Sequence, residues 1–149
     1  MKSKIALYFL INFFIFNSIV SCDSEDLPLV KELTVAERMT SGTWKISNFT
    51  YKGNNKTADY NGVSFDFDAI SVALNNTGTL PVAGGWSVID EGFEGAPELV
   101  FILTLTSVEP RFTSISDDWK IISSSNTELK LKDENLETGD IDYLTFLKN

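Results

Sequence analysis

The sequence predicts an all-β domain, either an antiparallel barrel of about eight strands or a β-sandwich, with a short helix in front of it. Two observations carry this prediction. Apolar and polar residues alternate with a period of two in most segments between residues 43 and 148, which is typical of strands with one buried face. Clusters of Gly, Asn, Ser and Asp separate these segments, and such clusters favour turns.

The predicted helix begins at a Thr-x-x-Glu capping box, which runs from Thr34 to Glu37. In such a box the two side chains satisfy backbone N–H groups of the first helical turn. Gly42 follows at a distance that suits the C-terminal end of a short helix.

The first predicted strand, Thr43–Lys52, changes its apolar face part of the way along. Trp44 and Ile46 share one face, whereas Phe49 falls on the other, so the alternation slips near Asn48. A β-bulge inserts one extra residue into a strand and would return all three side chains to one face.

The remaining strands are predicted from the same alternation and are separated by turn-forming segments. The Asn75–Gly78 turn, the Glu91–Pro97 loop and the acidic Asp133–Asp140 segment are connections. The strands are residues 63–68, residues 70–74, Trp86–Asp90 after the Gly84-Gly85 pair, Glu98–Ser107, Trp119–Ser123, Thr127–Lys132 and Ile141–Lys148.

Three tryptophans each open a predicted strand, in Gly42-Thr43-Trp44, Gly85-Trp86 and Asp118-Trp119. A Leu129-Lys130-Leu131 strand follows the last of them, and Leu144-Thr145-Phe146-Leu147-Lys148 closes the chain. In this order the motifs resemble the lipocalin-like domains of bacterial lipoproteins, over roughly residues 33–149. The resemblance implies a lipocalin-like barrel and a non-enzymatic role in binding a small apolar molecule.

Residues 1–21 have the layout of a secretory signal peptide, because Lys2 and Lys4 precede a mostly apolar run from Ile5 to Val20. This run is shorter than the ~20 residues that a membrane-spanning helix needs. Its end, Ile19-Val20-Ser21-Cys22, resembles the lipobox of bacterial lipoproteins. We therefore expect Cys22, the only cysteine, to become the acylated first residue of the mature protein, with palmitate among its acyl chains.

Residues 22–32 are predicted to form an acidic tether between the lipid anchor and the β domain of residues 33–149. The run Asp23-Ser24-Glu25-Asp26 directly follows the cysteine. In one large group of outer-membrane bacteria, such a run resembles the signal that sends lipoproteins to the outer cell surface, whereas in enteric bacteria an aspartate directly after the cysteine resembles a mark for retention in the inner membrane. We expect a lipid-anchored protein of the outer membrane, at its periplasmic face or at the cell surface.

The charge of the chain argues against nucleic acid as a partner. The net charge is −9, and removing residues 1–21 would make it −11, since that segment carries two lysines and no acid. Such a surface repels nucleic acid and anionic lipid headgroups.

The sequence predicts no catalytic residues, no metal ligands and no cofactor. Histidine is absent, which removes the commonest general base and metal ligand, and no Gly-x-Ser-x-Gly motif is present. Asp66 with Asp68, and Asp140 with Asp142, are paired by their spacing on strands. We interpret both pairs as parts of solvated faces rather than as a calcium or acid–base site.

Two functions remain open, of which the first is the leading hypothesis and the second is the alternative. In the first, the barrel interior binds a small hydrophobic ligand, and the candidate pocket residues are Trp44, Phe65, Trp86, Phe101 and Trp119. In the second, these aromatic residues are plain core, and the outer face of a filled barrel docks onto an envelope protein.

Overall fold

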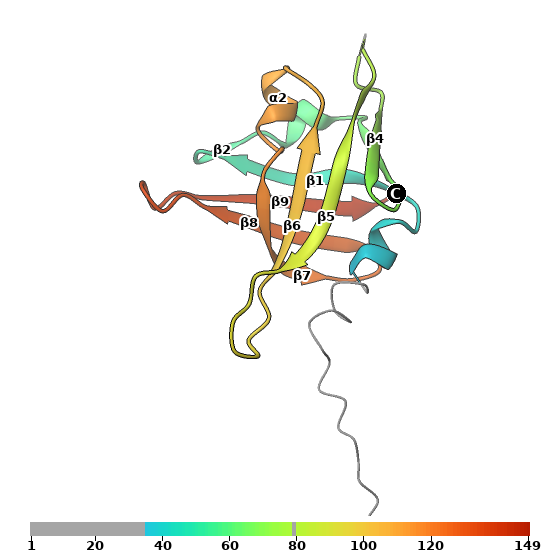
Figure 1. The fold of residues 1–149 in the computed structure, drawn as a ribbon. Helices are drawn as coiled ribbons and strands as arrows, with labels where there is room; N and C mark the ends of the chain where they lie inside the picture. The colour runs from blue at the N-terminus through green and yellow to red at the C-terminus, as the bar shows by residue number, and fades with distance from the viewer. Residues whose placement is uncertain (1–34, 79) are drawn as a thin grey trace, which may run out of the picture.

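Nine strands and three short helical segments are present in the computed structural model, which describes residues 35–78 and 80–149 (Figure 1). The helical segments are residues 35–39, η1 (Thr57–Tyr60) and α2 (Pro110–Thr113). The strands are β1 (Thr43–Tyr51), β2 (Asn54–Asn55), β3 (Ser64–Phe67), β4 (Ser71–Asn75), β5 (Val82–Asp90), β6 (Leu99–Leu105), β7 (Asp118–Ser124), β8 (Glu128–Glu134) and β9 (Ile141–Lys148).

Eight of these strands form a closed antiparallel barrel. β1 pairs with β3, each strand from β3 to β8 pairs with the next one along the chain, and β9 returns to pair with β1 from Trp44↔Lys148 to Thr50↔Tyr143. β2 lies outside the ring and pairs only with the end of β1. The predicted barrel is therefore confirmed, and the sandwich alternative is wrong because β1 and β9 close the sheet on itself.

The bulge predicted near Asn48 is present. The pairing of β1 with β9 shifts between Ile46 and Asn48, so Ser47 is the extra residue. As a result Trp44, Ile46 and Phe49 are all buried in one core. One inserted residue thus reconciles the two apolar phases of this strand.

The start of β5 differs from the prediction. The strand begins at Val82, so Gly84 and Gly85 lie inside it and Trp86 stands at its middle rather than at its start. A Cβ atom on Gly84 would lie 2.0 Å from the carbonyl oxygen of Thr104 on the neighbouring β6. Gly84 therefore permits a close approach of two strands. In the sequence alone, the Gly84-Gly85 pair resembles a turn signal.

The start of β4 also differs. Ile70 was predicted to continue the alternation of Val72 and Leu74, but it lies in the β3–β4 turn and is 80% exposed. The backbone N–H of Asp68 donates to the carbonyl oxygen of Ser71 across this turn. The tight turn reverses the chain at Ile70, which places the side chain in solvent.

Each end of the barrel is covered by a helical segment. Residues 35–39 precede β1 and cover the end at which β1 begins, where Val35 and Met39 join the core. The alternating strand directions of the antiparallel sheet make β1 and β6 end at the same end of the barrel, opposite residues 35–39. The segments that follow them, η1 and α2, cover that end (Figure 1). There Tyr60 and Phe112 are buried.

Candidate functional site

The five aromatic residues predicted to line a pocket all lie in the barrel core. Trp44, Phe65 and Phe101 are completely buried, and Trp86 and Trp119 expose 5% or less of their surface. They come from β1, β3, β5, β6 and β7, so the closed barrel brings them into one cluster with the rest of the core.

Side-chain rings occupy the space between these strands. The ring centroid of Phe67 is 5.3 Å from that of Trp86, 6.0 Å from that of Phe101 and 5.7 Å from that of Phe146. The Phe146 ring in turn lies 5.2 Å from the Phe65 ring. These separations are those of directly packed aromatic pairs. Phe67 and Phe146, which were not among the predicted pocket residues, therefore stand at the centre of the cluster.

The three tryptophans hold connecting segments against the strands. The indole N–H of Trp44 donates to the Met39 carbonyl oxygen at 2.8 Å. That of Trp86 donates to the Asp68 carbonyl oxygen at 2.8 Å, and that of Trp119 donates to the Ile115 carbonyl oxygen at 3.1 Å. Each indole therefore combines core packing with a hydrogen bond to a chain segment at a barrel end.

The first pair of aspartates, Asp66 and Asp68, is exposed where β3 ends, beside the start of β1. The second pair, Asp140 and Asp142, lines a hollow of about 460 Å³ together with Asp133 and other residues. Asp142 accepts a hydrogen bond from the backbone N–H of Lys52 at 2.7 Å.

This acidic hollow contains one carboxyl group with a perturbed pKa. Partial burial raises the pKa of Asp133, and the negative charges of Asp117, Asp142 and Asp118 add to the rise. Within residues 35–78 and 80–149, no group of three His, Cys, Asp or Glu residues is placed to hold a metal ion.

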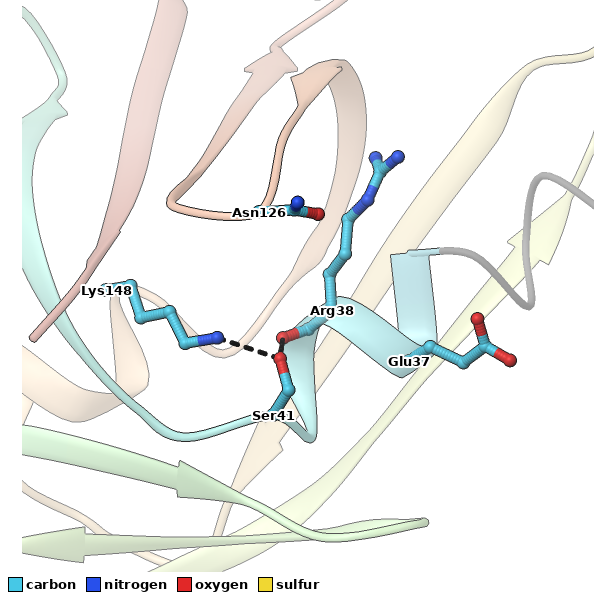
Figure 2. A pocket seen from close by; sticks show the side chains of 5 residues that line it. All are labelled: Glu37, Arg38, Ser41, Asn126 and Lys148. Atoms are coloured by element: carbon cyan, nitrogen blue, oxygen red, sulfur yellow. Dashed lines mark hydrogen bonds between the residues drawn. The ribbon is translucent and has the colours of Figure 1, made fainter.

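A second hollow, of about 470 Å³, carries the opposite charge and lies beside the helix of residues 35–39 (Figure 2). Glu37 and Arg38 come from this helix, and Ser41 follows it. Asn126 belongs to the β7–β8 turn, and Lys148 is the last residue of β9. Figure 2 shows the Glu37 side chain pointing away from Ser41 and Lys148. We call this region the cationic hollow.

Neutral oxygen atoms hold both cations of the cationic hollow in place. Arg38 Nη1 donates to the carbonyl oxygen of Ser124 at 3.1 Å and to its Oγ at 2.7 Å. Lys148 Nζ donates to Ser41 Oγ at 2.8 Å, and that hydroxyl donates to the Arg38 carbonyl oxygen at 2.7 Å. Both charges are therefore positioned by these bonds without being neutralised.

The two cations differ in this respect from several others on the barrel. Among the described residues, no carboxylate lies within 4.0 Å of the Arg38 or Lys148 head group, whereas three lysines of β7 and β8 form ion pairs with glutamates. These pairs are Lys120 with Glu98, Lys130 with Glu128 and Lys132 with Glu134.

Gly42 lies beside the Lys148 side chain, which lines the cationic hollow. Its φ of +125° suits glycine, and a Cβ atom there would lie 2.9 Å from Cε of Lys148. The Lys148 ammonium group also lies 5.7 Å from the centroid of the Trp44 ring, a distance at which a cation–π attraction acts. The glycine predicted as a helix end thus also makes room for a lysine side chain.

Sequence reasoning did not identify the cationic hollow. Arg38 and Ser124 are 86 positions apart, and Ser41 and Lys148 are 107 apart. No local motif links such distant residues, and only barrel closure brings them together.

Cys22, the predicted lipid attachment site, lies outside the described residues, as do the predicted signal peptide and tether. Each helix within residues 35–78 and 80–149 is too short or too polar to cross a membrane. No protein-family model and no curated protein matches the sequence.

Proposed function

We propose that this chain is a lipid-anchored lipoprotein of the bacterial outer membrane whose barrel contacts a partner through its outer surface. The interior is filled by the side chains of the protein itself. The observation that carries the proposal is the aromatic cluster around Phe67, because its rings occupy the space that an internal ligand would need.

The packing favours this function over the binding of a small apolar molecule inside the barrel. A barrel of eight strands has an interior just wide enough for side chains to fill. The indole N–H groups that could orient a polar end of a ligand already donate to backbone carbonyl oxygens. The hollows described above lie at the barrel ends and have polar linings.

A cavity-forming variant provides the test. Phe101→Ala would remove a completely buried ring and leave a dry apolar cavity, and cavities of this kind bind benzene-sized molecules. We expect toluene to raise the melting temperature of Phe101→Ala and to leave that of the wild type unchanged. Leu103→Ala, which truncates a neighbouring buried side chain of β6, is the milder variant if Phe101→Ala folds poorly.

The same measurement is then made on the wild-type chain with fatty acids of increasing length. The proposal predicts no saturable binding by the wild type. Stoichiometric binding of a fatty acid, accompanied by a rise in melting temperature, would show that the interior opens to a ligand and would restore the apolar-ligand hypothesis.

A further inference from the structure

We propose that the cationic hollow binds a phosphate group, carried by the headgroup of a membrane lipid. This inference rests on the proposed function, because it assumes the lipid anchor at Cys22, and it adds a ligand for the outer surface of the barrel. It starts from Arg38 and Lys148, which have no carboxylate partner within 4.0 Å among the described residues and which line one hollow together.

The donors of the cationic hollow suit a phosphate. Arg38 uses Nη1 for its bonds to Ser124, which leaves the N–H groups of Nε and Nη2 to donate to two oxygens of one phosphate. Lys148 uses one N–H for Ser41 and retains two more. The side-chain amide of Asn126 lines the same hollow and can donate as well.

The cations are also held in place before any ligand arrives. Hydrogen bonds to Ser124 and Ser41 hold Arg38 and Lys148, respectively. Gly42 leaves room for the Lys148 side chain in this position. Arg38 and Lys148 are both partly buried, so less rotamer freedom remains to be lost on binding than for two fully exposed cations. Glu37, the one carboxylate of the lining, points away from Ser41 and Lys148 in Figure 2.

The position of the hollow favours a lipid headgroup over free phosphate. The hollow adjoins residue 35, where the chain enters the barrel, and an extended chain from Cys22 to Val35 spans at most roughly 45 Å. The acidic hollow lies at the opposite end of the barrel, at the β8–β9 connection. An anchored barrel that turns the cationic hollow to the bilayer therefore turns the acidic hollow away from it, although Asp66, Asp68 and the β5–β6 connection with Glu91 and Glu94 lie at the same end as the cationic hollow.

This local arrangement revises the expectation that the surface repels anionic headgroups. Salt screens exposed charges beyond about 8–10 Å, so a headgroup at the cationic hollow experiences Arg38 and Lys148 more strongly than the net charge of −9. The repulsion predicted from composition is an average over the whole molecule.

The test uses the full chain in uncharged maltoside micelles, with the backbone amide resonances of Ser41, Asn126 and Lys148 as the readout. The micelles are doped with phosphatidic acid, or with diacylglycerol as the matched lipid without phosphate. Inorganic phosphate is titrated separately. We expect phosphatidic acid to shift these resonances saturably and diacylglycerol to leave them in place.

Charge-removing variants assign the effect to the hollow. Arg38→Gln and Lys148→Gln should each weaken the response to phosphatidic acid by about tenfold, as expected for the loss of a charge-assisted hydrogen bond. Lys148→Arg, which keeps the charge, should retain most of the response. Lys130→Gln, which changes an ion-paired lysine of β8 elsewhere on the barrel, should respond as the wild type does.

Two results would overturn the inference. Resonances that do not move, or that move equally in the Gln variants, would exclude phosphate binding at the hollow. An equally strong response to inorganic phosphate in micelles without phosphatidic acid would keep the phosphate site and overturn the lipid headgroup as its ligand. Neither result depends on the toluene measurement, so the inference and the filled-barrel proposal can fail separately.

Discussion

Residues at the two barrel ends combine burial with a hydrogen bond to a neighbouring segment of the fold. Trp44 reaches back to the helix of residues 35–39 through Met39, and Tyr60 of η1 donates its hydroxyl hydrogen to the carbonyl oxygen of Arg111 in α2. A buried polar group that has its partner stabilises the fold, whereas the same group without a partner destabilises it. These two residues therefore report on the closure of opposite ends of the barrel.

The first prediction concerns Trp44. Trp44→Ala should lower the free energy of unfolding by roughly 3–5 kcal/mol, because it removes a completely buried indole ring. Trp44→Phe should cost less, since it keeps most of the ring but leaves the Met39 carbonyl oxygen without its donor. Urea unfolding followed by circular dichroism measures both values. An alanine variant that melts within a degree or two of the wild type would show that the ring contributes little to the core.

The second prediction concerns the alkaline stability that Tyr60 confers. Burial raises the pKa of Tyr60 to about 12 from 10.0. Below pH 10 the phenol is protonated in both states. Between pH 10 and 12 the unfolded chain loses this proton while the folded chain keeps it, so stability falls as the pH rises.

Tyr60→Phe cannot ionise and should show a shallower loss of stability in this window. At pH 7 the variant should be less stable by about 1 kcal/mol, because the hydrogen bond to Arg111 is lost. Unfolding in urea at pH 8, 10 and 11 compares the two proteins. Parallel pH profiles for wild type and variant would contradict the role given to the buried phenol.

At the scale of the strands, single residues decide whether neighbouring strands can pair. The extra residue Ser47 lets β1 follow β9 along the whole seam that closes the barrel. A second register shift, between Ile121 and Ser123, accompanies the pairing of β7 with β8. Gly84 lets β5 approach its neighbour β6 closely.

The third prediction compares two adjacent glycines of β5. Gly84→Ala should destabilise the domain by about 1–3 kcal/mol. The new Cβ would meet the backbone oxygen of Thr104, which cannot rotate away as a side chain can. Gly85→Ala is the matched control, since its Cβ would have an ordinary 3.5 Å contact with the Ile70 carbonyl oxygen. Thermal unfolding of the two variants measures the difference. Equal melting temperatures would contradict the close approach of the strands at Gly84.

At the scale of the whole molecule, the cationic and acidic hollows lie at opposite ends of the barrel, although Asp66, Asp68 and the β5–β6 connection with Glu91 and Glu94 share the end of the cationic hollow. Arg38 and Lys148 lie at the end where β1 begins and β9 ends, and Asp117, Asp133 and Asp142 lie at the other end. The closed sheet fixes these two groups relative to each other. In the proposed anchored form, a tether attached before residue 35 would place the cationic hollow nearer to the membrane than the acidic hollow.

The fourth prediction concerns that tether. If Ile19–Cys22 is the lipobox that we propose, Cys22→Ala should abolish incorporation of labelled palmitate and leave an unprocessed precursor, because the acylated thiol is removed. Metabolic labelling followed by electrophoresis measures both effects. A Ser24→Ala variant, which leaves the lipobox intact, should be labelled as the wild type is. Equal labelling of the Cys22→Ala chain would contradict the lipoprotein assignment.

The sequence by itself determined the all-β class, the number of about eight strands, the helix before β1 and the bulge in β1, because alternation and turn residues are local signals. It also marked Trp44, Phe65, Trp86, Phe101 and Trp119 as members of one interior. Only the tertiary structure decided between barrel and sandwich, because closure depends on the pairing of Trp44 with Lys148 and its neighbours, about a hundred residues apart. The same pairing places Lys148 near Ser41 and Arg38. The cationic hollow is therefore a product of closure, and no periodicity within a strand could have predicted it.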